Sequence, residues 1–412
     1  MLLVTTSLKK TFLFLCVFIC FKTFAQNNIP ILETGGTSMP NEWIDDITGH
    51  RVIKLINRAG INSSFYFHNN PFIISADKKN DKMIFFGTTN GVKNAYTVNL
   101  ENKEVTQITF SETSIGAEIV GHKYNNLYFQ KQDKVYVTNI KTKETKLVFT
   151  FPENYKGNIA TVNSDETILA GSKASDAQAD IPKKYPEKKD FFDRIFDAHE
   201  PNDLFTINIK TGKLQVIHTE RTWLGHVQFS PTNPSILMFC HEGPWHKLDR
   251  IWHININTKE VKLMHKRTMD MEIAGHEWFA PDGKTIWFDL QQPKGETFFV
   301  AGTNIKTGVE KKYRVKRDEW SIHFNISDDQ KMFCGDGGDA GQVARATNGM
   351  WIYHFMPLGD SLKSEKLVNM KHQYYKLEPN VHFTPNGKWV VFRANFEGTE
   401  NVYAVEVKKY TN

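Results

Sequence analysis

The chain has 412 residues, with 51 Lys and Arg against 46 Asp and Glu, and its net charge of +5 is spread along the sequence. This modest, unclustered charge argues against a nucleic-acid-binding protein and weakly favours an acidic substrate. Aromatic residues make up 13% of the chain and accompany many short strand patterns, which indicates an all-β protein.

The first segment, residues 1–25, has the features of a signal peptide. Two lysines precede the apolar run 11–21, and Ala25 offers a small residue for cleavage. The run is too short for a stable membrane span, and no later stretch is long and apolar enough to form one. We therefore expect residues 26–412 to form one exported, periplasmic domain. Lipidation of a cysteine within the first segment is a less favoured alternative.

Two cysteines, Cys240 and Cys334, remain after this segment, and both end apolar runs. Neither has the spacing of a metal ligand. Two buried thiols are the favoured interpretation, while a disulfide stays open because the compartment is expected to be oxidising.

A pattern of one strand, a tight turn and a second strand recurs along the rest of the chain. Clear copies lie at 225–231, 275–283 and 379–387, and a looser copy lies at 321–329. Each copy has an apolar anchor in its first strand, and the anchors recur about every 40 to 70 residues, as in repeat proteins. The anchors are Phe72, Val120, Val162, Phe229, Phe279, Phe324 and Phe383.

A later strand pattern also recurs seven times and is usually followed by one more alternating strand. Its copies are 94–99, 134–139, 203–208, 250–255, 297–302, 349–354 and 401–406. Four strands per unit at this period predict the blades of a β-propeller. The last unit lacks a fourth strand, whereas residues 48–55 form an unmatched strand. Joining the two predicts a seven-bladed β-propeller, whose ring is closed by an N-terminal strand that completes the C-terminal blade.

The longest interval between anchors contains an insertion at about residues 174–202, rich in Lys, Asp and Pro. We expect a loop or short helix on the surface. A neutral decoration is favoured over a cover for the substrate.

Polar residues recur at fixed positions before the anchors. His226, His276 and Asn380 lie three residues before an anchor, and His323 and His382 lie one residue before. In a propeller, the first strand of each blade lines a central channel. Because side chains alternate along a strand, both positions are expected to point the same way, into this channel. A single histidine in a blade more often only bonds the backbone, but the shared phase in four units favours a site.

The loops expected at the same face add His, Arg and carboxylate groups. This polar and aromatic rim suits a metal-assisted site for an anionic sugar. By itself, the Gly-Asp-Gly-Gly-Asp loop at 335–339 is compatible with a turn, a calcium loop or a substrate contact, and a turn is the default interpretation. The candidates in these loops are Arg221, His241, His246, Arg250, Asp336, Asp339 and Arg393.

These residues resemble the oligogalacturonate lyase family, polysaccharide lyase family 22. The most specific segments are 223–226, 239–244, 275–277 and 335–339, and the resemblance extends from residue 45 to the C-terminus. It implies a seven-bladed propeller that holds a divalent metal, typically manganese, and cleaves short pectic oligouronides by β-elimination.

Carried over by position, the resemblance makes His276 a metal ligand and His241 the catalytic base. An arginine assists in the family, and Arg221 and Arg250 are the nearest candidates. His226, His246, His323, Asp336, Asp339 and Arg393 are then expected to bind substrate.

The last blade departs from the family pattern of one Gln and two His. This chain has Tyr375, Glu378 and Asn380 there, and His382 is a substitute ligand two residues on. Oxygen ligands favour hard ions, so the expected ion is Mn²⁺, with Ca²⁺ or Mg²⁺ as alternatives.

The predicted function is therefore a metal-dependent lyase for short uronic-acid oligosaccharides. The alternatives are a non-catalytic propeller that binds a sugar or a protein, a hydrolase on the same scaffold, or a lyase for a different uronide. The oligomeric state stays open.

Overall fold

The computed structural model describes residues 29–339, 344 and 349–411. The expected signal peptide, residues 1–25, lies outside the described residues. The described chain forms six β-sheets, with two α-helices in one connection. None of the helices in this part of the chain is long and apolar enough to cross a lipid bilayer.

Three sheets each contain four strands that follow one another in the sequence and pair antiparallel. The first comprises β9 (Gly116–Gly121), β10 (Asn126–Lys131), β11 (Lys134–Asn139) and β12 (Thr145–Thr150). The second comprises β13 (Asn158–Val162), β14 (Ile168–Ala174), β15 (Asn202–Asn208) and β16 (Leu214–Glu220). The third comprises β17 (Trp223–Phe229), β18 (Ile236–Glu242), β19 (Ile251–Asn255) and β20 (Val261–Leu263).

Two larger sheets repeat this four-strand run. One has five strands: β4 (Ile61–Ser63), β5 (Phe72–Ile73), β6 (Lys82–Thr89), β7 (Val92–Asn99) and β8 (Val105–Gln107). The other contains two runs, which one parallel pair between Arg314 and Ser361 joins. Its strands are β21 (Ile273–Phe279), β22 (Thr285–Gln291), β23 (Phe298–Asn304), β24 (Glu310–Val315), β25 (Phe324–Ile326), β26 (Phe333–Gly335), β27 (Trp351–Leu358) and β28 (Ser361–Asn369).

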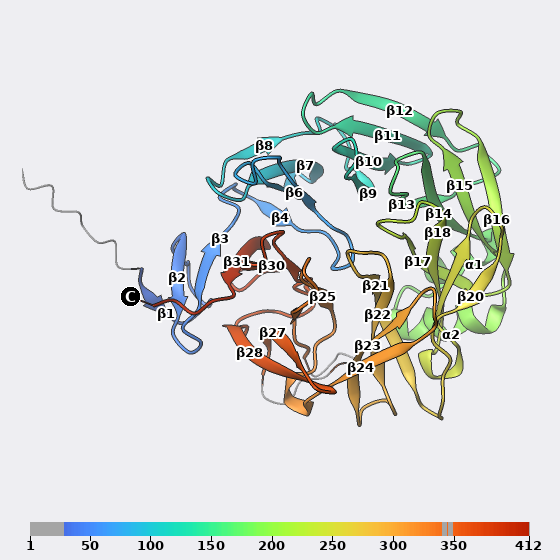
Figure 1. Ribbon diagram of the computed structural model, residues 1–412. Coiled ribbons are helices and arrows are strands. Elements are labelled where there is room, and N and C mark those ends of the chain that lie inside the picture. The colour runs from blue at the N-terminus through green and yellow to red at the C-terminus, as the bar shows by residue number, and fades with distance from the viewer. Residues whose placement is uncertain (1–28, 340–343, 345–348, 412) are drawn as a thin grey trace, which may run out of the picture.

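Figure 1 shows these sheets arranged around a common axis, with the first strand of a run toward the middle and the fourth toward the rim. Buried side chains pack between neighbouring sheets; Leu204 of β15, for example, shares a cluster with Phe239 of β18. Burying such a side chain stabilises the fold by about 1.5–3 kcal/mol. The prediction of an all-β protein is confirmed, and the arrangement is propeller-like.

The sixth sheet joins the two ends of the chain. Its order is β1 (Ile31–Leu32), β2 (Glu42–Asp45), β3 (Arg51–Lys54), β31 (Asn401–Glu406), β30 (Trp389–Ala394) and β29 (His382–Phe383). The pairing of the N-terminal strand β3 with the last strand β31 is as predicted, with Val52 opposite Val405. The strands β1 and β2, which extend this sheet beyond β3, were not predicted from the sequence repeats. Trp43 of β2 is fully buried and packs edge-on against Tyr403.

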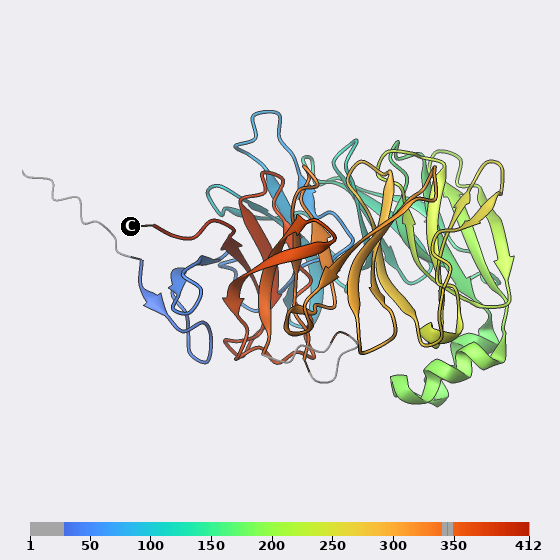
Figure 2. The ribbon, with the colours of Figure 1, turned by 60° about the horizontal axis from the view of Figure 1, so that its bottom comes forward.

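The insertion contains two helices, α1 (Asp176–Lys184) and α2 (Lys188–Ala198), between β14 and β15. Ser175 caps α1, because its hydroxyl accepts a hydrogen bond of 3.0 Å from the backbone N–H of Gln178. Figure 2 shows both helices projecting beyond the strands. The insertion, expected to be a loop or a short helix, is therefore helical.

Cys240 and Cys334 are both buried and free, as favoured. Remote from each other in sequence, they lie in different sheets, on β18 and β26.

A bulge recurs in the innermost strands and aims the side chains of the site. Ala117, His226, His276 and Asn380 all have positive φ, from 47° to 52°. Each lies three residues before an anchor, and the strand registers shift at this point in β9, β17 and β21. Such a bulge inserts one residue, bends the strand and redirects a side chain. A non-glycine residue in this conformation is uncommon.

Candidate active site

Three imidazoles gather on or beside the innermost strands, and each faces a carboxylate through its Nδ1 atom. Nδ1 of His226 lies 3.3 Å from Oε1 of Glu277, and Nδ1 of His276 lies 2.9 Å from Oδ1 of Asp289. Nδ1 of His323, just before β25, lies 2.7 Å from Oδ2 of its neighbour on the Gly-Asp-Gly-Gly-Asp loop, Asp336. We call this set the channel-mouth cluster. A carboxylate at one ring nitrogen fixes the ring. The second ring nitrogen of His226 lies 3.6 Å from Oε1 of Glu242.

The cluster is compact because two of its members come from adjacent runs of one sheet. The ring centroids of His276 and His323 are 4.9 Å apart and the rings are perpendicular. The backbone N–H of Asn380 donates to Oδ2 of Asp336 at 3.2 Å, and Oε2 of Glu378 lies 3.7 Å from Nε2 of His323. Five predicted site residues therefore lie close to one another here: His276, His323, Asp336, Glu378 and Asn380.

Arg250 is fully buried behind His226 and bridges two glutamates. Its Nη2 donates to Oε1 of Glu242 at 2.8 Å, and its Nε donates to Oε2 of Glu277 at 3.0 Å. Its guanidinium also lies 4.7 Å from the ring centroid of Trp245. Burial opposes ionisation of Glu242, but the charge of Arg250 outweighs this and lowers the pKa of Glu242 to about 2. Both glutamates thus stay negative beside His226.

The imidazoles differ in their protonation. Burial lowers the pKa of His226, and the carboxylate of Glu277 offsets this only in part. Burial would also lower the pKa of His276, but the charge and hydrogen bond of Asp289 raise it above its usual value. One imidazole of the cluster is therefore held neutral and another is held toward its cationic form.

The loop between β4 and β5 contacts the channel-mouth cluster and was not predicted from the sequence. The ring of Tyr66 lies edge-on to His226 and His323, at centroid distances of 6.1 and 5.0 Å, and its hydroxyl is 3.2 Å from Nε2 of His323. Phe67 stacks on His323 at 4.7 Å and packs on Trp278. The run of aromatic, His and Asn residues at 65–70 was the available signal, but it lies outside the strand repeat.

The predicted metal ligands do not converge. Asn380 uses both ends of its amide within the protein, since Oδ1 accepts from the N–H of Phe67 at 3.0 Å and Nδ2 donates to the carbonyl of Glu378 at 3.0 Å. Nε2 of His382 lies 2.9 Å from the carbonyl oxygen of Asn69. Of the predicted set, His276 and Glu378 alone keep donor atoms directed at the cluster.

Tyr375, at the position of the family's glutamine, is also engaged, because its hydroxyl donates to the carbonyls of Asp336 and Gly337. Across residues 29–339, 344 and 349–411, no three His, Cys, Asp or Glu side chains form a group that could hold a metal ion. The donors present therefore do not fit the metal site that the resemblance implied.

His241 lies apart from the cluster. It alternates along β18 with Glu242, so the two side chains point to opposite faces of the strand. Its Nε2 lies 3.1 Å from Oε2 of Glu220, which also accepts from His218, and its ring stacks on Trp252 at 5.0 Å. The two hydrogen bonds lower the pKa of Glu220 to about 2.

The remaining predicted residues line the periphery. Arg221 is exposed, and its Nη1 donates to the carbonyl of His199 after α2 at 3.2 Å. His246 lies in the short 3-10 helix Trp245–Lys247 and accepts, through its carbonyl, a hydrogen bond from Arg267. Nε of Arg393 donates to the carbonyl of Glu378 at 2.8 Å. Asp339 is half-buried on the loop that carries Asp336.

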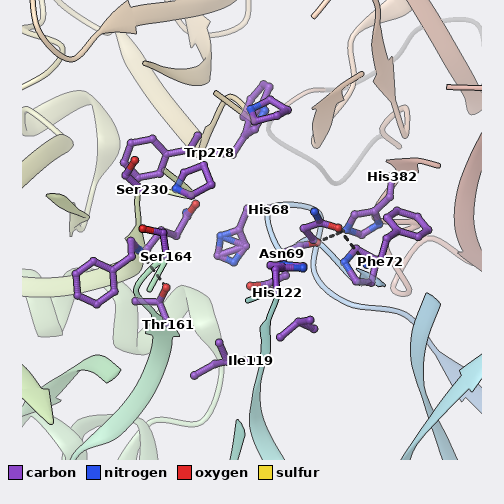
Figure 3. A pocket seen from close by; sticks show the side chains of 18 of the residues that line it. His68, Asn69, Phe72, Ile119, His122, Thr161, Ser164, Ser230, Trp278 and His382 are labelled. Atoms are coloured by element: carbon purple, nitrogen blue, oxygen red, sulfur yellow. Dashed lines mark hydrogen bonds between the residues drawn. The ribbon is translucent and has the colours of Figure 1, made fainter. Parts of the chain in front are cut away.

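A cavity of about 270 Å³ lies further along the same innermost strands, where several of the anchors line it. We call it the lower cavity. Figure 3 shows His68 near the middle of this cavity, His122 close to it and His382 at the right. The three imidazoles of the channel-mouth cluster do not line it. His382 was expected to share the cluster, but Asn380, two residues before it, has a left-handed backbone with φ of 52°, which breaks the alternation, and His382 lines this cavity.

Known proteins match this chain over most of its length. The family model for oligogalacturonate lyase matches residues 38–410. The oligogalacturonide lyase of Pectobacterium atrosepticum is 24% identical over 381 residues, which cover 88% of this chain and 95% of that protein.

Solved structures show the same fold. A crystal structure of oligogalacturonate lyase from Vibrio parahaemolyticus has a TM-score of 0.77 and 24% identity, and covers 89% of this chain and 96% of that one. An oligogalacturonate lyase in complex with manganese has a TM-score of 0.76 and 22% identity over the same shares. A β-propeller domain from Myceliophteria thermophila matches at a TM-score of 0.52 and 9% identity, covering 86% of this chain and 98% of that one. From the family model, this chain belongs to the oligogalacturonate lyase family.

Proposed function

We propose that this protein cleaves short oligogalacturonides by β-elimination and leaves a 4,5-unsaturated uronate on one product. Membership of the family supports the reaction class. The observation that carries the proposal is the cluster of carboxylate-paired imidazoles, in which His226 and His276 have pKa values shifted in opposite directions. We also propose that the four-strand runs form seven blades, and that residues 1–25 direct export to the periplasm.

The chemistry needs two groups of opposite character. The C5 proton of a uronate is only weakly acidic, and its removal places negative charge on the C6 carboxylate. A cationic donor at that carboxylate stabilises the enolate-like intermediate, and a neutral base removes the proton. Titratable groups whose environments push their pKa values apart suit these two roles.

His276 is the proposed cationic group. Asp289 holds its Nδ1 at 2.9 Å and favours the imidazolium, which leaves Nε2 to pair with the C6 carboxylate. No step of this scheme depends on a bound cation, because Tyr375 and Asn380 use their side chains within the protein.

His226 is the proposed base in place of His241. It is neutral near pH 7, lies in the cluster and is held between Glu242 and Glu277 at 3.6 and 3.3 Å. It takes the C5 proton, the C5–H electrons form the C4–C5 double bond, and the C4–O4 bond breaks with its electron pair on O4. The paired glutamates then stabilise the imidazolium that forms.

The second candidate function is a propeller that binds a uronide without cleaving it. The observation that favours it is the loss of two family imidazoles at Glu378 and Asn380. Binding of oligogalacturonide with no product would support this reading.

The test is the ultraviolet absorbance of the unsaturated product, measured with purified protein and oligogalacturonides. We expect a steady rise with the wild-type protein, a rise slowed about 10²–10⁴-fold in His226→Ala, and an unchanged rise in the exposed control His372→Ala. No rise in the wild-type protein would contradict the proposed reaction. New reducing ends without absorbance would indicate a hydrolase.

A further inference from the structure

The leaving sugar in the proposed elimination departs as an alkoxide unless a proton is supplied to O4. His226 is occupied with the C5 proton, and His276 with the carboxylate. A third group is therefore needed as a general acid, and the mouth of the channel holds a hydroxyl in a suitable place.

That hydroxyl belongs to Tyr66. Its ring lies between His226 and His323, at centroid distances of 6.1 and 5.0 Å, so it adjoins the proposed base directly. The ring is half-buried and does not line the lower cavity. Through its contacts with His226 and His323, the side chain of Tyr66 points toward the cluster.

A chain of contacts positions the hydroxyl. Asp336 holds His323 twice, through Nδ1 at 2.7 Å and through the backbone N–H at 2.9 Å. Phe67 stacks on the same imidazole at 4.7 Å. Nε2 of His323 then lies 3.2 Å from the hydroxyl of Tyr66. Because Asp336 accepts the proton on Nδ1, Nε2 of His323 accepts from the Tyr66 hydroxyl and fixes its oxygen in place. The O–H turns from this nitrogen to O4 when the leaving sugar is protonated.

Burial and the neighbouring carboxylates keep the hydroxyl of Tyr66 protonated. Burial first, and then the carboxylates of Glu378 and Glu277, raise the pKa of Tyr66 well above its usual value. The phenol is therefore neutral and keeps a proton that it can give to an alkoxide.

We propose that Tyr66 is the general acid of the elimination, giving its phenolic proton to O4 of the leaving sugar, and that the Asp336–His323 pair positions it. This inference rests on the proposed function. The step is balanced: the C4–O4 electron pair goes to O4, O4 gains the proton of Tyr66, and His226 holds the proton from C5. Transfer of that proton from His226 to the phenolate restores both groups, so one turnover consumes no proton.

The test uses Tyr66→Phe, which keeps the aromatic packing of the loop and removes the hydroxyl alone. On oligogalacturonide we expect kcat to fall about 10²–10³-fold with KM nearly unchanged. On a galacturonide with a 4-nitrophenoxy group at C4, whose departure needs no proton, we expect the variant to approach the wild-type rate. The matched control is Tyr374→Phe, whose exposed side chain lies outside the cluster.

Three outcomes are distinct. Rescue by the aryl leaving group supports the acid role, whereas equal losses on both substrates, or no loss on oligogalacturonide, overturn it. In each of these cases the wild-type protein still forms unsaturated product. A wild-type protein that forms none from either substrate overturns the proposed function and this inference together.

Discussion

The channel contains two groups of histidines that differ in their partners. At the mouth, each of His226, His276 and His323 faces a carboxylate at 2.7–3.3 Å. In the lower cavity, His382 has a backbone carbonyl as its hydrogen-bond partner, and burial lowers its pKa to about 4. Burial likewise lowers the pKa of His68 well below its usual value. The same residue type is thus paired with carboxylates at one end and forms a neutral, polar lining at the other.

The largest expected effect separates the two groups by activity. His226→Ala should lower kcat about 10²–10⁴-fold, because it removes the proposed base. His122→Ala, in the lower cavity, should stay within about threefold, since a lining imidazole contributes no chemistry. Initial rates of product absorbance measure both. Equal losses in the two variants would remove the distinction between the two ends.

A large effect on stability is expected at Arg250, which holds Glu242 and Glu277 beside the mouth. Arg250→Met leaves two buried carboxylates without their cation, and should lower the free energy of unfolding by about 3–5 kcal/mol. Denaturant unfolding measures this. A change below about 1 kcal/mol would show that water or a rearranged side chain compensates the pair.

A smaller effect is expected from Asp289→Asn, read through pH. In the wild-type protein, kcat/KM should fall at low pH as His226 gains a proton, and at high pH as His276 loses one. Because Asp289 raises the pKa of His276, the amide should move the alkaline limb to lower pH and leave the acidic limb in place. The loss at pH 8 should be about ten- to a hundredfold. An alkaline limb that stays in place would separate His276 from the reaction.

The smallest effect is expected at His241, the base implied by the family resemblance. Its imidazole bonds Glu220 on the opposite face of β18 from Glu242. His241→Ala should therefore lower kcat less than about tenfold. A loss as large as that of His226→Ala would return the role of base to His241.

The strand repeats in the sequence predicted much of the fold and part of the candidate site. The spacing of anchors placed His226 and His276 on equivalent positions, and the unmatched strand 48–55 predicted the pairing of β3 with β31. Alternation then failed at a specific point. His323 and His382 both lie one residue before an anchor, but only His382 follows a residue with left-handed backbone, Asn380, and lines the lower cavity.

Tyr66 could not be predicted from the repeats, because it lies in a connecting loop. Loop conformation depends on tertiary contacts, here the hydrogen bond from the N–H of Phe67 to Asn380. The same bond explains why the expected metal ligands were misplaced. An amide in the position of a family imidazole anchors this loop instead of directing a donor at a cation.

The most direct test of the account is the product formed from trigalacturonate by wild-type protein after exhaustive chelation, measured by mass spectrometry and ultraviolet absorbance. We predict an unsaturated fragment, lighter by one water than the hydrolysed fragment, at a rate within about twofold of that with added Mn²⁺. A chelated protein that forms no product until Mn²⁺ is restored would contradict the assignment of the carboxylate-neutralising role to His276.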